Sequence, residues 1–294
     1  LALAETKQFL EKYGKKSDLT ALHVNHQTQN DSVNWQQHSE SFCKKHNINF
    51  LSKTVDIKET GQGYEAAARS ARLEIFNSLD QGSAIILGHH LDDQVETVFF
   101  RVLRGTGLKG LSGMRRHVNI NGRDFIRPLL HVTKEEIYKY VNDQKLTHIE
   151  DQSNDDNAYS RNFLRNEIIP QIVERWPGAK KNTARMANLL AKQSSLYHGL
   201  LLERLKNVCD EDGLLLDELR NLDYFERSEI IRIWLDQQSF ASPNESQMKE
   251  LEKSFFQSRQ DANPTIKFYR EDAQKTGVIL SKINNYLTAE EINE

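Results

Sequence analysis

A run of acidic and imidazole side chains is the part of this sequence best suited to chemistry. Residues 89–96 read His-His-Leu-Asp-Asp-Gln-Val-Glu and follow an apolar segment, 84–88, that is typical of a buried parallel strand. If a helix begins there, four side chains share one helix face at i, i+3, i+4 and i+7: His89, Asp92, Asp93 and Glu96. A helix start alone accounts for one or two acids. The two histidines and the glycines that follow favour a ligand site beyond the strand end.

The elements that must position this run alternate between strands and helices along the first half of the chain. We expect strands at 19–24, 48–55, 84–88 and 125–126, and helices at 1–14, 31–46, 65–79, 91–104, 133–145 and 162–175. This alternation predicts βαβ units and a Rossmann-like α/β fold with a parallel sheet. Thr133 and Glu136 fit a capping box at one helix start.

The second half of the chain is predicted to be a smaller, mainly α-helical domain. The break Trp176-Pro177-Gly178 separates it from the first domain. The predicted boundaries are 1–178 for the α/β domain, 179–207 for a connecting helix, 208–270 for a small helical domain, and 271–294 for a tail or the start of a further C-terminal domain. Further helices are expected within 214–238 and at 244–258, and short strands within 265–285.

Composition excludes several classes of protein. The 294 residues contain no apolar run near the length of a membrane span and no secretory signal pattern, so we expect a soluble, cytoplasmic protein without a membrane partner. Cys43 and Cys209 exclude a disulfide framework and a CxxC metal site, and they fit a reducing compartment. The net charge of −3 leaves nucleic-acid contact to a local basic stretch, although a solvated helix face explains such a stretch equally well.

Several motifs in order resemble one family. They are His23-Val24-Asn25-His26, the segments 65–72 and 89–97, Arg104-Gly105-Thr106-Gly107, Gly110-Leu111, Arg127-Pro128-Leu129-Leu130, and the segments 150–154 and 161–165. Together they resemble the N-type ATP pyrophosphatases, also called the PP-loop family, and within it the branch that forms lysidine in tRNA(Ile).

The resemblance implies an adenine nucleotide alpha hydrolase-like fold and a ligase that forms a carbon–nitrogen bond. ATP would adenylate the C2 oxygen of the cytidine at the first anticodon position of tRNA(Ile) with a CAU anticodon, releasing pyrophosphate. The amine of L-lysine would then displace AMP. The implied cofactors are ATP and Mg²⁺, the implied partners are this tRNA and lysine, and a homodimer is a candidate assembly.

The needs of that reaction assign roles to particular side chains. Catalytic roles are predicted for Asp92, Asp93, Glu96, Arg69 and Arg72, with Asp93 and Glu96 as the Mg²⁺ ligands. Nucleotide binding is predicted for His23, Asn25, His26, His89, Gly105, Thr106 and Gly107. Contacts to tRNA phosphates are predicted for Arg161, Arg165, Lys180, Lys181 and Arg185. Structural alternatives remain: a helix C-cap for Gly105, a solvated helix face for Arg69 and Arg72, and a structural histidine at His26.

Two departures from the family pattern concern the ends of the chain. The family's phosphate loop, Ser-Gly-Gly-x-Asp-Ser, is not in this sequence, and we expect it immediately upstream of Leu1. Longer members carry a further C-terminal domain, and we expect this chain to contain only a part of it. The alternatives are a 2-thiocytidine enzyme, which would need CxxC cysteines, an amide-forming synthetase, and a non-catalytic tRNA-binding module.

Overall fold

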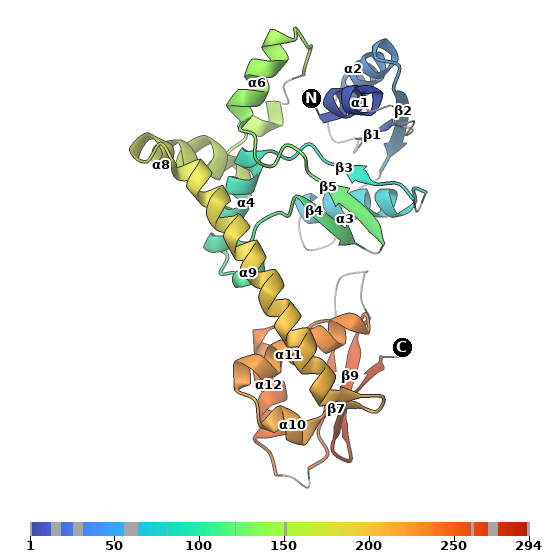
Figure 1. Ribbon diagram of the computed structural model, residues 1–294, viewed down its shortest axis with the longest axis vertical. Coiled ribbons are helices and arrows are strands. Elements are labelled where there is room, and N and C mark those ends of the chain that lie inside the picture. Colours follow the sequence, from blue (N-terminus) through green and yellow to red (C-terminus); the bar gives the residue numbers. More distant parts are fainter. Residues whose placement is uncertain are drawn as a thin grey trace. The chain divides into compact units, whose positions relative to one another are not determined.

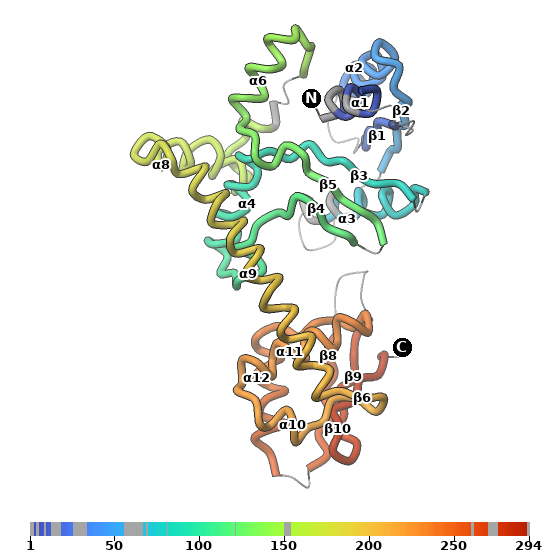
Figure 2. The backbone as a smooth tube through the Cα atoms, in the orientation of Figure 1, coloured from blue at the N-terminus to red at the C-terminus, as the bar shows by residue number. Residues whose placement is uncertain are grey.

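The computed structural model describes residues 2–12, 19–25, 32–55, 64–80, 82–120, 122–149, 152–259, 262–269 and 276–292. The chain divides into two compact units, Leu1–Ala191 and Lys192–Glu294 (Figures 1 and 2). Among the described residues, no helix is both long enough and apolar enough to cross a membrane.

Unit 1 begins with helix α1 (Ala2–Lys12) and a βαβ arrangement. Strand β1 (Thr20–Asn25) pairs in parallel with β2 (Asn49–Thr54), and helix α2 (Ser32–Lys45) connects them. Cys43 on α2 and Ile48 before β2 are buried. The parallel pairing predicted from the alternating pattern is confirmed in this pair.

A second sheet of unit 1 leads into the acidic run. Helix α3 (Tyr64–Asn77) precedes the short strand β3 (Ile85–Ile86), which pairs in parallel with β5 (Arg123–Ile126). Strand β4 (His117–Ile120) then pairs antiparallel with β5. Strand β4 lies within the loop predicted at 105–124: Val118 and Ile120 alternate with His117 and Asn119, but four residues are too short a run to be distinguished from a loop. That loop also contains the short helix α5 (Leu108–Leu111).

Helix α4 (Leu91–Leu103) follows β3 after the loop 87–90 and carries the acidic run. Helix α6 (Lys134–Asp143) begins with the predicted capping box, which is confirmed: Thr133 Oγ1 accepts from the N–H of Glu136 at 3.1 Å, and Glu136 Oε2 accepts from the N–H of Thr133 at 2.7 Å. The predicted helices at 91–104 and 133–145 are therefore correct to within one or two residues.

The helical segment before Trp176 is not regular. It consists of a 3₁₀ turn η1 (Gln152–Asp155), α7 (Ser160–Phe163), a π-helical turn η2 (Leu164–Ile168) and α8 (Ile169–Arg175). Pro170 lacks a backbone N–H, so the regular α ladder cannot run unbroken through this point. Ile169 packs with Leu91 and Val95 of α4, which places the η2 turn beside the acidic run.

Helix α9 (Ala179–Val208) is continuous across the boundary between the two units. Within the described part of unit 2, five strands form an antiparallel sheet in the order β6 (Cys209–Asp210), β7 (Gly213–Leu215), β10 (Tyr286–Glu291), β9 (Val278–Ile283), β8 (Thr265–Phe268). The helices of unit 2 after α9 are α10 (Leu216–Arg220), α11 (Tyr224–Gln237), α12 (Glu245–Leu251) and the π turn η3 (Glu252–Phe256).

The core of unit 2 lies between these helices and the sheet. Leu214, Leu235, Leu251, Leu280 and Leu287 are fully buried in one cluster. The strands β8 and β9 confirm the strands expected within 265–285, and β6, β7 and all of β10 extend the sheet beyond that prediction. The α/β unit followed by a largely helical unit agrees with the predicted fold class, with a larger sheet in unit 2 than the sequence indicated.

Candidate active site

The first turn of α4 is locked by a reciprocal cap. His90 is the N-cap residue: its Nδ1 accepts from the N–H of Asp93 at 3.4 Å, and Asp93 Oδ2 accepts from the N–H of His90 at 2.9 Å. Such a pair satisfies two of the backbone donors that a helix start leaves without partners. The Oδ2 atom of Asp93 thus caps the helix, whereas its Oδ1 atom lies 3.8 Å from Arg165 Nη2.

Glu96 lies one turn further along α4 and is almost fully buried, with 2% of its surface exposed. Its Oε1 accepts from Arg165 Nε at 2.7 Å and its Oε2 from Arg165 Nη2 at 2.8 Å. Two parallel charge-assisted bonds of this kind offset the cost of burying the carboxylate. The same bonds are the main cause that raises the pKa of Arg165. Arg165 Nη1 also donates to Asn154 Oδ1 at 3.0 Å.

Arg161 reaches the same face of α4 from helix α7. Its Nη2 donates to Thr97 Oγ1 at 2.9 Å, and its Nε lies 3.7 Å from Glu96 Oε2. Thr97 Oγ1 in turn donates to the carbonyl of Asp93 at 2.7 Å. Two arginines predicted to contact RNA phosphates, Arg161 and Arg165, are therefore brought together with the acids predicted to act in catalysis.

Asp92 connects α4 to two other helices. Its Oδ1 accepts from Lys180 Nζ of α9 at 2.6 Å, and its Oδ2 accepts from the backbone N–H of Lys134, the first residue of α6, at 2.7 Å. Burial acts to raise the pKa of Asp92, but these two hydrogen bonds outweigh it and the pKa is lowered. Lys180 was predicted to bind tRNA, and in this structure it neutralises Asp92.

His89 stands between the end of β3 and the cap of α4. Its Nδ1 is buried and has no hydrogen-bond partner within the described residues. Burial is the main cause that lowers the pKa of His89; the charge of Asp93 opposes this, and the charges of Arg127, Arg161 and Arg72 add to it. A neutral imidazole surrounded by guanidinium groups is suited to an anionic ligand. Arg127 was not predicted as a site residue, although its Arg-Pro-Leu-Leu motif was noted.

The tip of β1 is less informative. Asn25 is buried, and its Nδ2 donates to Gln36 Oε1 at 3.4 Å. Burial lowers the pKa of His23, whose ring is tilted against Phe50 at 6.4 Å. His26 and the side chain of Arg69 lie outside what the structure describes, and Arg72 is on α3.

The glycine-rich segment 105–114 is fastened to α4. The Gln94 amide donates to the carbonyl of Met114 at 3.0 Å and accepts from its N–H at 2.7 Å. Arg101 Nη1 donates to the carbonyls of Gly110 at 2.9 Å and Gly113 at 3.1 Å. Sequence reasoning missed both clamps, because neither residue lies on the acidic face of α4.

The three nucleotide-binding candidates in this segment have ordinary structural surroundings. Gly105 has φ +68° immediately after α4, the left-handed backbone of a helix C-cap region. Gly107 is the N-cap residue of α5. Thr106 Oγ1 lies where a Cβ at Gly110 would sit, 1.7 Å away, so residue 110 must be glycine for this packing.

Two other predicted tRNA contacts, Lys181 and Arg185, are exposed one turn apart on α9. Neither makes an ion pair with the residues that the structure describes, in contrast to Lys180 and Arg165. Their roles and those of the other predicted residues remain proposals.

Metal ligation is restricted by the pairings described above. Among the described residues, no group of three or more His, Cys, Asp or Glu side chains is arranged to hold a metal ion. Mg²⁺ needs only a carboxylate or two together with phosphate oxygens. Asp93 and Glu96 are the two predicted Mg²⁺ ligands. Arg165 binds both oxygens of Glu96, and the N–H of His90 binds Asp93 Oδ2, so among the described residues only Asp93 Oδ1 of these four oxygens accepts no hydrogen bond.

Comparison with known proteins places this arrangement in a family. A model of the PP-loop domain matches residues 2–172. The chain is 36% identical over 250 residues to a tRNA(Ile)-lysidine synthase from Enterobacter sp. (strain 638), covering 84% of the chain and 59% of that protein. It is 32% identical over 252 residues to the enzyme of the same name from Legionella pneumophila (strain Lens), covering 85% of the chain and 58% of that protein.

The chain thus spans a little under three fifths of the length of these curated relatives. Among solved structures, it is similar to the U34-tRNA thiolase NcsA from Methanococcus maripaludis with its [4Fe-4S] cluster. The TM-score is 0.50 at 18% identity, covering 64% of this chain and 67% of the other. At that identity the likeness concerns the fold alone.

Proposed function

The chain belongs to the PP-loop family, and on that premise we propose that it catalyses ATP-dependent formation of lysidine in tRNA(Ile) with a CAU anticodon. In the first step a bond forms between the C2 oxygen of the cytidine and the α-phosphorus of ATP, and pyrophosphate leaves. In the second step the amine of L-lysine attacks C2, and the oxygen leaves with AMP. The enzyme is then a ligase that forms a carbon–nitrogen bond. The relatives named above support this substrate.

The observation that carries the proposal is the acid–arginine cluster at the end of β3. Glu96, Arg165, Arg161 and Asp93 are joined within one network beside His89. The carboxyl end of a parallel strand is where α/β folds of this kind bind ligands. A merely structural helix start would need the His90–Asp93 cap, but not a buried glutamate with two arginines.

The phosphates of ATP would lie near His89. The charge of Asp93 acts on its imidazole and is opposed by the charges of Arg127, Arg161 and Arg72, and these three guanidinium groups would attract a polyphosphate. The buried Nδ1 of His89 is available within the described residues as a donor or acceptor for the ligand. These fixed cations would stabilise negative charge as the bond to pyrophosphate breaks.

Mg²⁺ bound at this site would neutralise phosphate charge and orient the leaving group. Asp93 Oδ1 is our candidate ligand on this chain. Glu96 serves the site in a different way, by fixing the guanidinium of Arg165 so that it lies beside Asp93. A direct metal contact by Glu96 would require that ion pair to open.

Contacts to the tRNA backbone are proposed for Lys181 and Arg185. Both are exposed on α9 beside Lys180, whose own charge is matched by Asp92. Arg161, Arg165 and Lys180 would contribute to RNA binding only through exchange of their present partners. The lysine amine is expected to approach from the same strand end, where Asp93 carries negative charge.

A 2-thiocytidine enzyme is the alternative within the fold, since one solved structure similar to this chain is a tRNA thiolase. The sequence contains two cysteines, Cys43 on α2 and Cys209 on β6, whereas iron–sulfur clusters are usually held by four cysteine thiolates. Lysine transfer is therefore favoured over sulfur transfer.

The adenylation step can be tested by itself. Full-length protein is incubated with γ-labelled ATP, Mg²⁺ and unmodified CAU tRNA in the absence of lysine, and labelled pyrophosphate is measured. We expect one pyrophosphate for each enzyme-bound tRNA, and none with a tRNA in which the first anticodon cytidine is replaced by uridine. Release that does not depend on that cytidine, or tight tRNA binding without any release, would contradict the proposal.

A further inference from the structure

The segment 97–123 of unit 1, here called the basic segment, carries cations that have no role in the proposed reaction. Its 27 residues contain no Asp or Glu, although acids make up 42 of the 294 residues of the chain. It contains six cations: Arg101, Arg104, Lys109, Arg115, Arg116 and Arg123. In a chain of net charge −3, such a concentration of positive charge is typical of a surface that contacts an anion.

Two of the six cations hold the backbone in place. Arg101 donates to two carbonyls of the glycine-rich segment, and the buried Arg123 donates to three carbonyls between α3 and β3. The Gln94 amide adds its two hydrogen bonds to Met114. The remaining cations are therefore carried on a backbone that is fastened to α4.

The other four cations are exposed. Arg104 follows α4 directly, Lys109 lies on α5, and Arg115 and Arg116 come just after the Gln94 clamp. Arg104 contacts a ring, with its Cζ 5.1 Å from the centre of Phe100. None of the four makes an ion pair with a residue that the structure describes, whereas the arginines of the acid–arginine cluster are paired with Glu96. Their charges are thus available to an external anion.

Apolar side chains are exposed in the same segment. Val102 is 50% exposed, Leu103 is 71% exposed and Leu108 is 37% exposed. The loop of an RNA hairpin presents phosphates together with unstacked bases, and proteins bind such bases against apolar side chains and guanidinium planes. A surface that combines arginines with exposed leucines therefore fits an RNA loop.

The basic segment contacts the proposed active site through Arg127. Arg127 Nη1 donates to the carbonyl of Arg115 at 3.0 Å, and the N–H of Arg127 donates to the carbonyl of Arg116 at 2.7 Å. The charge of Arg127 also acts on His89, where the phosphates of ATP would lie. A nucleotide that reacts at His89 would therefore have its flanking phosphates beside Arg115 and Arg116.

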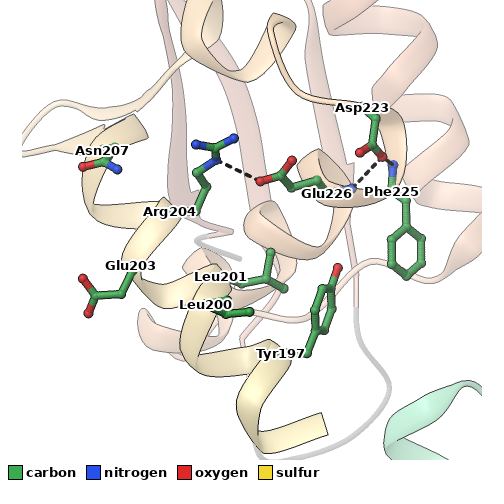
Figure 3. A pocket seen from close by; sticks show the side chains of 9 residues that line it. All are labelled: Tyr197, Leu200, Leu201, Glu203, Arg204, Asn207, Asp223, Phe225 and Glu226. Carbon is green, nitrogen blue, oxygen red and sulfur yellow. Dashed lines mark hydrogen bonds and ion pairs between the residues drawn. The ribbon is translucent and has the colours of Figure 1, made fainter. Parts of the chain in front are cut away.

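A cavity in unit 2 has the opposite character (Figure 3). It has a volume of about 610 Å³ and is lined by α9 and the start of α11. Its carboxylates are engaged: Glu226 accepts from Arg204 at 2.9 Å, Glu203 accepts from Lys206 at 2.8 Å, and Asp223 caps α11. The one guanidinium among its described lining residues is that of Arg204, which is already paired. The exposed cations of the basic segment are better suited to phosphate.

We propose that the exposed side chains of the basic segment form an RNA-binding surface, in addition to the cations proposed on α9. Arg115 and Arg116 bind the phosphates that flank the target cytidine. Arg104 and Lys109 bind other phosphates of the same anticodon stem-loop, and Leu103 packs against an unstacked base of the loop. This inference rests on the proposed function, which identifies the RNA.

The charged part of the surface is tested by binding alone, without ATP. Fluorescence anisotropy follows a labelled CAU anticodon stem-loop titrated with full-length protein over a range of salt. Arg115→Gln/Arg116→Gln keeps the backbone carbonyls that Arg127 uses. We expect about tenfold weaker binding and a slope of log affinity against log salt that is smaller by about 1.5, since each phosphate contact contributes about 0.7–0.9.

The matched control is Lys44→Gln/Lys45→Gln, which changes another adjacent pair of exposed cations in unit 1, at the end of α2. It should bind the stem-loop like the wild type. Wild-type affinity and salt slope in Arg115→Gln/Arg116→Gln, or equal losses in the two double variants, would overturn the proposal.

The apolar part of the surface is tested by Leu103→Gln, which changes an exposed side chain near the end of α4. We expect stem-loop binding to weaken about three- to fivefold with an unchanged salt slope, because no charge is removed. Wild-type affinity in Leu103→Gln would overturn the contact with a base.

Kinetics separates this surface from the reaction itself. A wild-type protein that releases no pyrophosphate would contradict the proposed function, while the anisotropy data would still decide whether the surface binds RNA. In the active enzyme, Arg115→Gln/Arg116→Gln should raise the KM for tRNA about tenfold and leave kcat and the KM for ATP unchanged. A raised KM for ATP instead would overturn the proposal in favour of nucleotide binding. Phosphatidylglycerol vesicles that bind more tightly than the stem-loop, and only when Arg115 and Arg116 are present, would overturn it in favour of a membrane surface.

Discussion

The guanidinium of Arg165 holds both carboxylate oxygens of Glu96, with Nε 2.7 Å from Oε1 and Nη2 2.8 Å from Oε2. The two residues are 69 positions apart in the chain, one on the π turn η2 and the other in the middle of α4. Because the Glu96 side chain is 3% exposed, water cannot replace a lost partner. The pair therefore fixes the η2 turn against the helix that carries the acidic run.

Replacing Arg165 by lysine should lower the stability of unit 1. Arg165→Lys replaces a two-pronged donor by a point charge that cannot bind both oxygens of Glu96. We expect a loss of about 2 kcal/mol in the free energy of unfolding, below the range for fully buried pairs because the Arg165 side chain is 27% exposed. Urea unfolding measures it, with the exposed Arg175→Lys as the control. Equal losses of stability in Arg165→Lys and Arg175→Lys would show that the pair of Arg165 with Glu96 does not stabilise unit 1.

Loss of the Asp93 charge should separate chemistry from tRNA binding. Asp93→Asn keeps an oxygen that can accept from the N–H of His90, so the start of α4 is preserved. We expect pyrophosphate release to fall at least about a hundredfold, while the affinity for tRNA in a filter-binding assay changes less than about twofold. Wild-type turnover in Asp93→Asn would show that Asp93 does not hold the metal ion.

Removal of two exposed cations should change the salt dependence of tRNA binding. The double variant Lys181→Ala/Arg185→Ala is expected to reduce the slope of log affinity against log salt by about 1.5, since each phosphate contact contributes about 0.7–0.9. Lys139→Ala, an exposed lysine of α6, is the control. An unchanged slope in the double variant would assign both residues to the solvated face of α9.

The glycine-rich segment offers a matched pair of substitutions. Gly113 has φ +62°, and a Cβ there would lie 2.7 Å from the Gln94 amide, so Gly113→Ala should cost about 2–3 kcal/mol of stability. A Cβ at Gly107 would meet nothing within 4 Å, and its backbone has an ordinary φ of −82°, so Gly107→Ala should stay within about 0.5 kcal/mol. Similar unfolding midpoints for the two variants would contradict the Gln94 clamp.

His89 should make stability depend on pH. Burial is the main cause that lowers the pKa of His89 in the folded protein from its ordinary value of 6.5. In the window between the folded pKa and 6.5, the unfolded chain binds a proton that the folded chain does not. Stability therefore rises as the pH rises through this window and is complete above it. The urea midpoint should depend less on pH in His89→Gln than in the wild type, and the exposed control His198→Gln should behave like the wild type. If His89→Gln keeps the pH dependence of the wild type, a group other than His89 causes it.

Local signals predicted much of this site, because they act within one turn of helix or one strand. The apolar run before His89 and the spacing of the acids located α4, and Thr133 with Glu136 located the start of α6. The motifs of the PP-loop family located the same region, and the resemblance is confirmed by the comparisons.

Partners far apart in the sequence could not be predicted in this way. The basic side chains Arg165 and Lys180 looked available for RNA until folding placed them on Glu96 and Asp92, 69 and 88 residues away. The clamps by Gln94 and Arg101 depend on the return of the segment 105–114 to the opposite side of α4. Strands as short as β6 and β7 contain too few residues to show an alternating pattern.

The central claim is tested most directly by the nucleoside at the first anticodon position. Full-length protein is incubated with ATP, Mg²⁺, isotopically labelled lysine and unmodified CAU tRNA, and the digested tRNA is analysed by mass spectrometry. We expect a labelled lysine–cytidine adduct at that position, with AMP and pyrophosphate formed in equal amounts and no adduct without ATP. Pyrophosphate release with an unmodified cytidine, or a sulfur-containing cytidine in its place, would contradict lysidine formation.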